Sequence, residues 1–148
     1  MVETKNKGNS FNLFLAEGCT AKELTLQADL KTLGGEEDPG GGLVLRVQNI
    51  NNYYLARWNA NESNFRVYLM KDGKRQLIAS ANIKVDTKLW HEIEIQHRGN
   101  HIQAKLDKAD AISLDDTTFT EAGGLGLYAK SDSISAFNDI RLSVAKAD

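Results

Sequence analysis

A repeated alternation of apolar and polar residues with a period of two limits the fold of this chain more than any other feature. Period two puts successive side chains on opposite faces of an extended strand, whereas a helix repeats about every 3.6 residues. Turn-forming runs such as NANES at 59–63 and KDGK at 71–74 separate the alternating segments. We therefore predict an all-β sandwich or barrel. The alternating segments are residues 24–30, 43–47, 65–69, 93–96 and 102–106. The residues predicted to line the core are Trp58, Phe65, Val67, Leu69, Ile93, Ile95, Leu106, Leu125, Leu127 and Ile140.

Helices have little place in this pattern. Only residues 116–122, DTTFTEA, could form a helical turn, and that run is too short to be stable alone. Because no helix follows each strand, a parallel βαβ sheet is excluded. The glycine-rich segment 34–42 precedes no helix and contains no lysine, so it predicts a flexible connection and not a phosphate-binding loop.

Composition narrows the classes of partner. The 148 residues suit one domain, and 18 Lys and Arg against 20 Asp and Glu are interleaved along the chain. Nucleic acid is therefore not an expected partner, and no apolar run is long enough for membrane insertion. Cys19 is the single cysteine, so we expect no disulfide and no zinc site, only a half-buried thiol. Residues 1–10 are polar and contain no signal peptide.

Short turns fix the register of the central strands, and the register sorts their side chains between two faces. If Asn59 lies opposite Asn64, one face is apolar, with Trp58 opposite Phe65. If Gln48 also lies opposite Tyr53, the apolar face gains Leu43, Leu45 and Val47. The other face then carries Arg46, Tyr53, Arg57, Arg66 and Tyr68.

Two interpretations of that second face remain open. In one, the arginines pair with sheet acids such as Glu92 and Glu94, and the tyrosines cover the pleat. In the other, the face is a ligand platform, where the tyrosine rings pack on sugars and each arginine offers a planar fork of donors. A site on the loops is a third alternative.

Several segments together resemble the bacterial laminin G-like, concanavalin A-like jelly-roll domains, a group related to 3-keto-disaccharide hydrolase-like domains. The matching segments are residues 40–81, 89–107 with WHEIEIQ, 116–133 and 136–142. The resemblance implies one antiparallel two-sheet jelly roll over residues 1–148. It leaves function open, because this fold hosts lectins, glycosidases and adhesive modules. The chain departs from its relatives at two places. Relatives usually carry one or two more strands before the position of Val2, which are shortened or absent here. They also carry Asp-Gly where this chain has Asp107-Lys108.

Catalytic chemistry is not evident. Glycosidases of this fold commonly place paired carboxylates on one strand, and Glu92 with Glu94 is the nearest approximation. The preferred interpretation is that these two acids balance the sheet arginines. His91 and His97 are six residues apart on one strand, roughly 20 Å, which is too far to share a metal ion. No Ser-His-Asp arrangement is recognisable, so we assign no catalytic residue.

By analogy with related jelly rolls, Glu17 and Asp139 could bind a structural calcium ion, although no EF-hand spacing supports it. The leading hypothesis is a noncatalytic carbohydrate-binding module on an exported protein, periplasmic or extracellular. One alternative is a glycoside or keto-sugar hydrolase of the same fold. Another is a structural or protein-interaction module.

Overall fold

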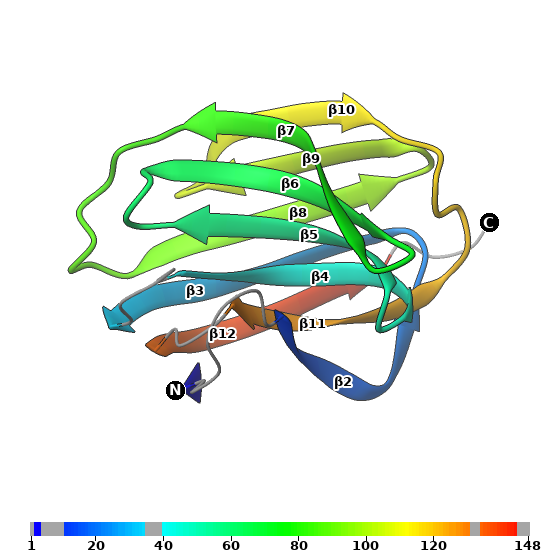
Figure 1. Cartoon of the computed structure of the whole chain (residues 1–148), viewed down its shortest axis with the longest axis horizontal. Coiled ribbons are helices and arrows are strands. Elements are labelled where there is room, and N and C mark those ends of the chain that lie inside the picture. Colours follow the sequence, from blue (N-terminus) through cyan, green and yellow to red (C-terminus); the bar gives the residue numbers. More distant parts are fainter. Residues whose placement is uncertain (1, 4–10, 35–39, 131–133, 145–148) are drawn as a thin grey trace.

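The computed structural model describes residues 2–3, 11–34, 40–130 and 134–144, and within them it contains twelve strands and no helix. The strands form two antiparallel six-stranded sheets, the jelly-roll sandwich predicted (Figure 1). Sheet A has the order β1 (Val2–Glu3), β12 (Ile134–Val144), β3 (Leu24–Gly34), β8 (His91–Arg98), β9 (His101–Leu106), β10 (Ala109–Asp115). Sheet B has the order β2 (Phe11–Ala21), β11 (Gly123–Lys130), β4 (Gly40–Asn49), β5 (Asn52–Asn59), β6 (Asn64–Lys71), β7 (Lys74–Asn82).

The main core lies between the two sheets, and the alternation in the sequence predicts most of its members. Leu125 and the inward residues of β5, β6, β8 and β9 are buried, as predicted: Trp58, Phe65, Val67, Leu69, Ile93, Ile95 and Leu106. Leu127, also predicted, is partly buried against this core. The prediction is wrong for Ile140, whose side chain is 54% exposed. The register of β12 shifts between Asn138 and Arg141, and Asp139 has a φ of +47°, so a β-bulge turns Ile140 out of the core.

Connections between the strands occupy the two ends of the sandwich. At one end lie the β2–β3, β8–β9 and β10–β11 connections, and at the other the β5–β6 turn and the β7–β8 loop (Figure 1). The predicted helical turn at 116–122 is absent, because this β10–β11 segment is an irregular loop. Tyr54 holds the loop, since its hydroxyl donates to Asp116 Oδ1 at 2.5 Å and accepts from the Phe119 N–H at 3.1 Å.

The glycine-rich segment is only partly a connection. Residues 35–39 lie outside the described residues, but Gly40, Gly41 and Gly42 begin β4. A Cβ atom on Gly42 would stand 2.2 Å from the carbonyl oxygen of Ala56 on β5. These glycines therefore allow β4 to approach its neighbour closely. No helix capable of crossing a membrane occurs in the described ranges.

Candidate functional site

The outer face of sheet B combines charged groups with aromatic ones. The register predicted for β5 and β6 is correct: Asn59 lies opposite Asn64, Arg57 opposite Arg66 and Leu55 opposite Tyr68. A second apolar cluster covers this outer face, separate from the main core. Its members are Val44, Val47, Tyr53, Leu55, Tyr68, Met70 and Tyr128.

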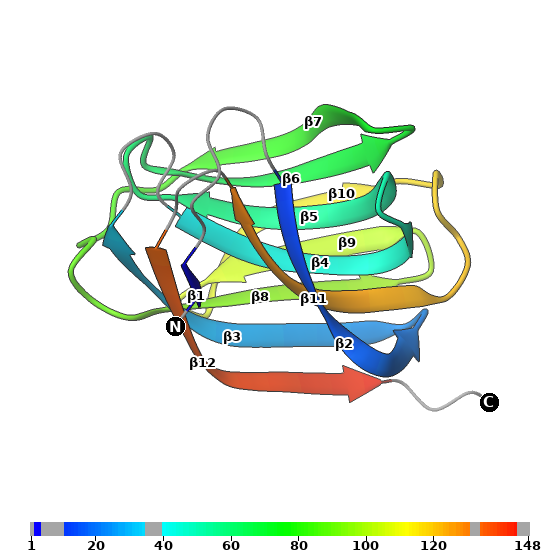
Figure 2. The same ribbon diagram turned by 60° about the horizontal axis from the view of Figure 1, so that its bottom comes forward.

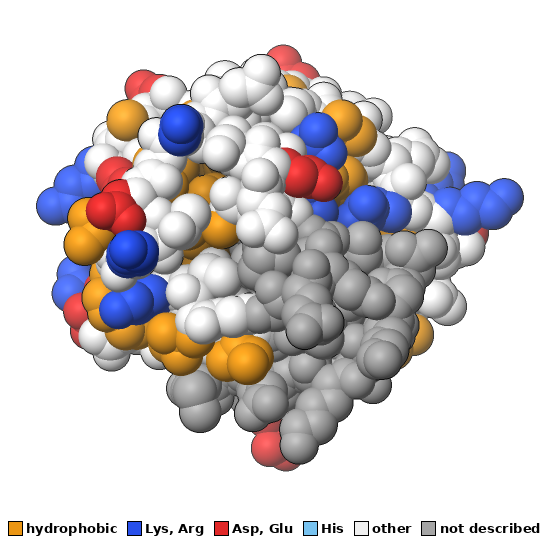
Figure 3. Space-filling view, turned by 60° about the vertical axis from the view of Figure 1, so that its left-hand side comes forward, with side chains coloured by type: hydrophobic (Ala, Val, Ile, Leu, Met, Phe, Trp, Pro, Cys, Tyr) orange, Lys and Arg blue, Asp and Glu red, His pale blue; other side chains and the backbone are white. Residues whose placement is uncertain are grey.

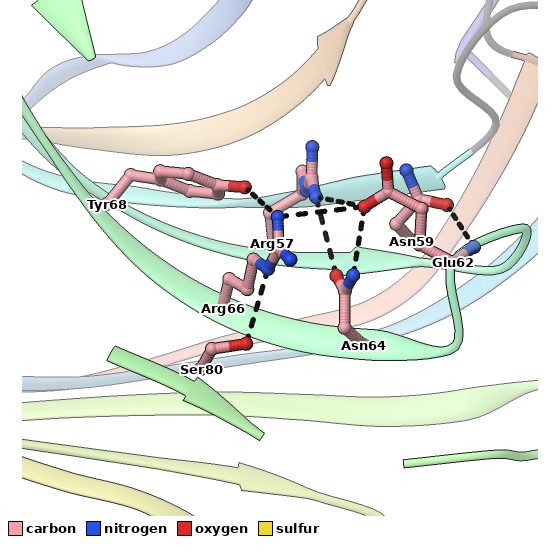
Figure 4. Close-up of polar contacts among 7 residues, drawn as sticks. All are labelled: Arg57, Asn59, Glu62, Asn64, Arg66, Tyr68 and Ser80. Atoms are coloured by element: carbon pink, nitrogen blue, oxygen red, sulfur yellow. Dashed lines mark hydrogen bonds and ion pairs between the residues drawn. The ribbon is translucent and has the colours of Figure 1, made fainter. Parts of the chain in front are cut away.

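Two like charges directly opposite each other on a sheet repel, and the β5–β6 turn supplies the acid that relieves Arg57 and Arg66. Glu62 Oε2 lies 3.3 Å from Arg57 Nη2 and 3.7 Å from Arg66 Nη1. Asn64 Nδ2 donates to the same oxygen at 2.9 Å, and Asn64 Oδ1 accepts from Arg57 Nη2 at 3.4 Å (Figure 4). We call Arg57, Glu62, Asn64, Arg66 and Tyr68 the arginine–glutamate cluster.

Local geometry fixes this carboxylate in place. Asn59 Oδ1 accepts a hydrogen bond from the Glu62 N–H at 3.0 Å, which closes the turn, and Ser63 follows with a φ of +52°. Arg66 donates through Nη1 to the Tyr68 hydroxyl at 3.1 Å and through Nε to Ser80 Oγ on β7 at 3.2 Å. Turn and strands therefore converge on one polar patch (Figure 4).

Exposure differs sharply within the cluster. The Glu62 side chain is 51% exposed and that of Arg66 is 30% exposed, so both can meet a ligand. Arg57 and Tyr68 are buried beneath them, and the Arg57 guanidinium stands 5.1 Å from the centre of the Tyr68 ring. Tyr53 is buried as well, and burial raises its pKa to about 12. Neither Tyr53 nor Tyr68 therefore offers the exposed ring that the platform interpretation requires.

Arg46 was expected on this face, and that prediction is wrong. The β4–β5 register shifts between Leu45 and Asn49, and Arg46 has a φ of +47°, so a bulge sends its side chain to the inner side. The same bulge moves Val47 to the outer apolar cluster. The buried Arg46 guanidinium donates to three backbone carbonyls, those of Lys22 at 3.1 Å, Phe119 at 2.9 Å and Gly99 at 2.9 Å.

Glu92 and Glu94 do not balance the arginines, contrary to the preferred interpretation. They lie on β8 in sheet A, because the β7–β8 loop carries the chain to the other layer. Glu94 lies 4.0 Å from Lys105 of β9. Glu92 stands opposite Asp29 and lines a hollow of about 30 Å³, which has room for a water molecule and not for a sugar ring.

The three histidines are separated, as expected. His91 Nδ1 lies 2.7 Å from Asp107 Oδ2 in a structural contact, and His97 is buried against Tyr54.

One arrangement of triad type does exist, although the sequence did not reveal it. His101 Nδ1 lies 2.8 Å from Asp115 Oδ1, and its Nε2 lies 3.0 Å from Ser113 Oγ. All three residues are exposed, and the Asp115 side chain is 77% exposed. In serine hydrolases a buried acid holds the histidine, whereas the acid of this surface arrangement is exposed.

The two predicted calcium ligands lie on different sheets. Glu17 lies on β2 in sheet B, whereas Asp139 faces the outer side of sheet A beside Asp29 and Glu92. The described residues include no group of three or more His, Cys, Asp or Glu side chains placed to hold a metal ion. Calcium binding stays a prediction. Cys19, expected to be half-buried, is exposed.

Comparison with known proteins identifies the architecture. No family model matches the chain, and no curated protein matches it. Its fold is similar to that of the carbohydrate binding module CBM66 from Bacillus subtilis, with a TM-score of 0.84, 18% identity, and coverage of 95% of this chain and 90% of that one. The chain has an antiparallel two-sheet jelly-roll fold.

Two further solved structures have the same architecture at lower similarity. A putative glycosyl hydrolase from Parabacteroides distasonis has a TM-score of 0.66 at 16% identity, over 97% of this chain and 90% of that one. Chicken galectin 2 has a TM-score of 0.63 at 11% identity, over 83% and 92%. Identities this low establish the fold of the chain and nothing finer.

Sequence reasoning found Tyr53, Arg57, Arg66 and Tyr68 on one face but missed Glu62 and Asn64. Two arginines predicted to oppose each other require a compensating acid, and Glu62 lies in the turn between them. That requirement was the signal available in the sequence.

Proposed function

We propose that this chain is a noncatalytic carbohydrate-binding module and that the arginine–glutamate cluster is its sugar-binding surface. The observation that carries the proposal is the exposed Glu62 carboxylate, held by Arg57, Asn64 and Arg66 on the outer face of sheet B. A carboxylate accepts hydrogen bonds from sugar hydroxyls, and a guanidinium donates to them, so together they can bind two adjacent hydroxyls. These side chains of the site are already hydrogen-bonded to one another, which reduces the entropic cost of binding a ligand.

The similarity in fold to CBM66, a carbohydrate binding module, supports the choice of ligand class. The buried aromatic layer beneath the cluster contributes rigidity here and not a stacking surface. Attachment to an exported protein remains part of the proposal, as does the finer relationship to laminin G-like domains.

A glycan array followed by calorimetry with the best-binding oligosaccharide tests the proposal. Glu62→Gln removes the charge but keeps an amide oxygen for Asn64, so we expect a loss of affinity of at least tenfold with a stable fold. Lys105→Gln, on the outer face of sheet A, is the matched control and should bind like the parent. Equal affinity in Glu62→Gln and the parent would contradict the assignment of the site. Release of sugar by the parent would contradict the noncatalytic assignment.

A further inference from the structure

A hollow of about 430 Å³ opens at the end of the sandwich where the β5–β6 turn and the β7–β8 loop lie. Figure 3 looks onto this end of the molecule. The hollow is lined by the C-terminal residues of β3, by the turn and by the loop: Lys31, Thr32, Leu33, Gly34, Ala60, Asn61, Thr87 and Lys88. Its volume is in the range of small-ligand sites.

The charge of this lining is one-sided. Among the described residues that line the hollow, Lys31 and Lys88 contribute two positive charges and none is an Asp or a Glu, in a chain whose net charge is −2. Asp86 is close in sequence, but its carboxylate accepts the backbone N–H of Lys88 at 2.9 Å. The Glu62 carboxylate follows Asn61 and is engaged by Arg57 and Asn64.

Polar groups in the hollow retain unused hydrogen-bonding capacity. Among the described residues, neither lysine ammonium takes part in an ion pair, whereas Lys105 on sheet A lies 4.0 Å from Glu94 and 3.7 Å from Asp110. The Thr32 hydroxyl is buried and has no hydrogen-bond partner in the same described part. Solvent does not reach this hydroxyl, so of these three groups the two lysine ammonium groups, and not Thr32, are the ones that a ligand in the hollow can meet.

We propose that this end pocket binds a saccharide that carries a carboxylate, a uronic acid or a short oligomer of it. The two ammonium groups suit the carboxylate, the Asn61 amide suits hydroxyls, and the apolar Leu33 and Ala60 suit the C–H face of a sugar ring. The site is distinct from the arginine–glutamate cluster, because the β5–β6 turn presents Asn61 to the end pocket and Glu62 to the face of sheet B. The proposal therefore stands whether or not the cluster binds sugar.

Calorimetry with digalacturonic acid tests the proposal, with its neutral dimethyl ester as the matched ligand. We expect the parent to bind the acid at least tenfold more tightly than the ester, and binding to weaken as salt screens the charges. The Lys31→Gln/Lys88→Gln double variant should lose at least tenfold in affinity for the acid. Lys84→Gln, a lysine of the same loop outside the hollow, should bind like the parent.

Three results would overturn the proposal. Equal binding of acid and ester would show that charge is not recognised, and equal competition by inorganic sulfate would show a general anion site. A loss of affinity in Arg66→Gln without a loss in the lysine variant would place the acid at the arginine–glutamate cluster instead. Amide chemical shifts of Thr32 and Thr87 provide a second readout and should move when digalacturonic acid is added to the parent.

Discussion

His97 is a titratable residue inside the main core, and it makes stability depend on pH. Its ring meets Tyr54 edge to face at 5.1 Å, and neither ring nitrogen has a hydrogen-bond partner among the described residues. Burial, and then the charge of Arg46, lower the pKa of His97 from 6.5 to about 4. His97 is therefore protonated below pH 6.5 in the unfolded chain, but only below about pH 4 in the folded chain. Stability present above pH 6.5 is lost across that window, by about 3 kcal/mol.

Replacing His97 with phenylalanine should flatten this dependence, because the ring remains and the proton site does not. Urea unfolding at pH 7.5, 6.0 and 4.5 measures the difference in stability between the variant and the parent. We expect the free energy of unfolding of the variant to rise relative to that of the parent by about 3 kcal/mol as the pH falls. His101→Gln, at an exposed histidine, is the control and should keep most of the slope of the parent. Parallel curves for His97→Phe and the parent would contradict the burial of a neutral imidazole.

Tyr68 allows a second test at the scale of single residues. Because its ring is only 3% exposed beneath Arg57, Tyr68→Ala should destabilise the fold by about 3 kcal/mol. Tyr68→Phe keeps the ring and removes only the hydroxyl that accepts from Arg66, so it should cost about 1 kcal/mol. Thermal and urea unfolding of both variants measure these costs. A Tyr68→Ala variant as stable as the parent would show that the ring is exposed.

Sequence periodicity predicts which side of a strand a residue occupies, and it does so only while the register is regular. Arg57, Arg66 and Tyr68 lie where the arithmetic of a short turn puts them. Arg46 and Ile140 do not, since each lies at a bulge with a positive φ at a residue other than glycine. Arg46 gives no sign of such a backbone conformation in the sequence, whereas Asp139 is of a residue type that adopts a positive φ more readily than most.

Two hairpin turns at the scale of elements have the same backbone form and different residues. Asp72 and Gly73, between β6 and β7, have φ values of +51° and +76°. Asp107 and Lys108, between β9 and β10, have φ values of +51° and +68°. Turns with two positive φ values favour glycine at the second position, where a side chain costs about 1 kcal/mol. Lys108 therefore carries strain that Gly73 avoids.

Lys108→Gly should stabilise the fold by about 0.5 to 1 kcal/mol, because the relief of strain outweighs the added freedom of the unfolded chain. The reverse change, Gly73→Lys, is the matched experiment and should destabilise by a similar amount. A Cβ atom at Gly73 meets nothing closer than 3.5 Å, so crowding does not complicate it. Urea midpoints measure both. Destabilisation by Lys108→Gly would show that Lys108 makes a contact that compensates for its φ.

The elements themselves follow from local patterns, and their assignment to layers does not. Strand positions, and the pairing of β5 with β6, depend on alternation and a short turn. The layer of β8 depends on the β7–β8 loop, whose direction no periodicity encodes, and the prediction therefore pairs Glu92 and Glu94 with arginines that lie in the other sheet. The arginine–glutamate cluster was half predicted for the same reason, since its acid comes from the turn and not from another strand.

The whole molecule has two unlike ends. One end contains the end pocket, whereas the other is closed around Arg46. From β4 of sheet B, this guanidinium reaches the β2–β3 turn, the β8–β9 turn of sheet A and the β10–β11 loop. Glu23 reinforces the contact, because its carboxylate lies 3.7 Å from Arg46 and accepts the Gly99 N–H at 2.8 Å. Figure 2 shows β2, β11 and β12, which run between the two ends along one side of the sandwich.

We expect Arg46→Met to destabilise the whole sandwich by about 3 to 5 kcal/mol, because it leaves carbonyl groups from three connections without their donor while filling a similar volume. Arg66→Met, at a guanidinium that is 30% exposed, should cost no more than about 1 kcal/mol. Urea unfolding measures both. Hydrogen exchange locates the effect, since the amides around Lys22, Gly99 and Phe119 should lose protection together if one side chain holds all three connections. Loss at only one of them, or equal stability of the two variants, would show that the end is closed by its loops and not by Arg46.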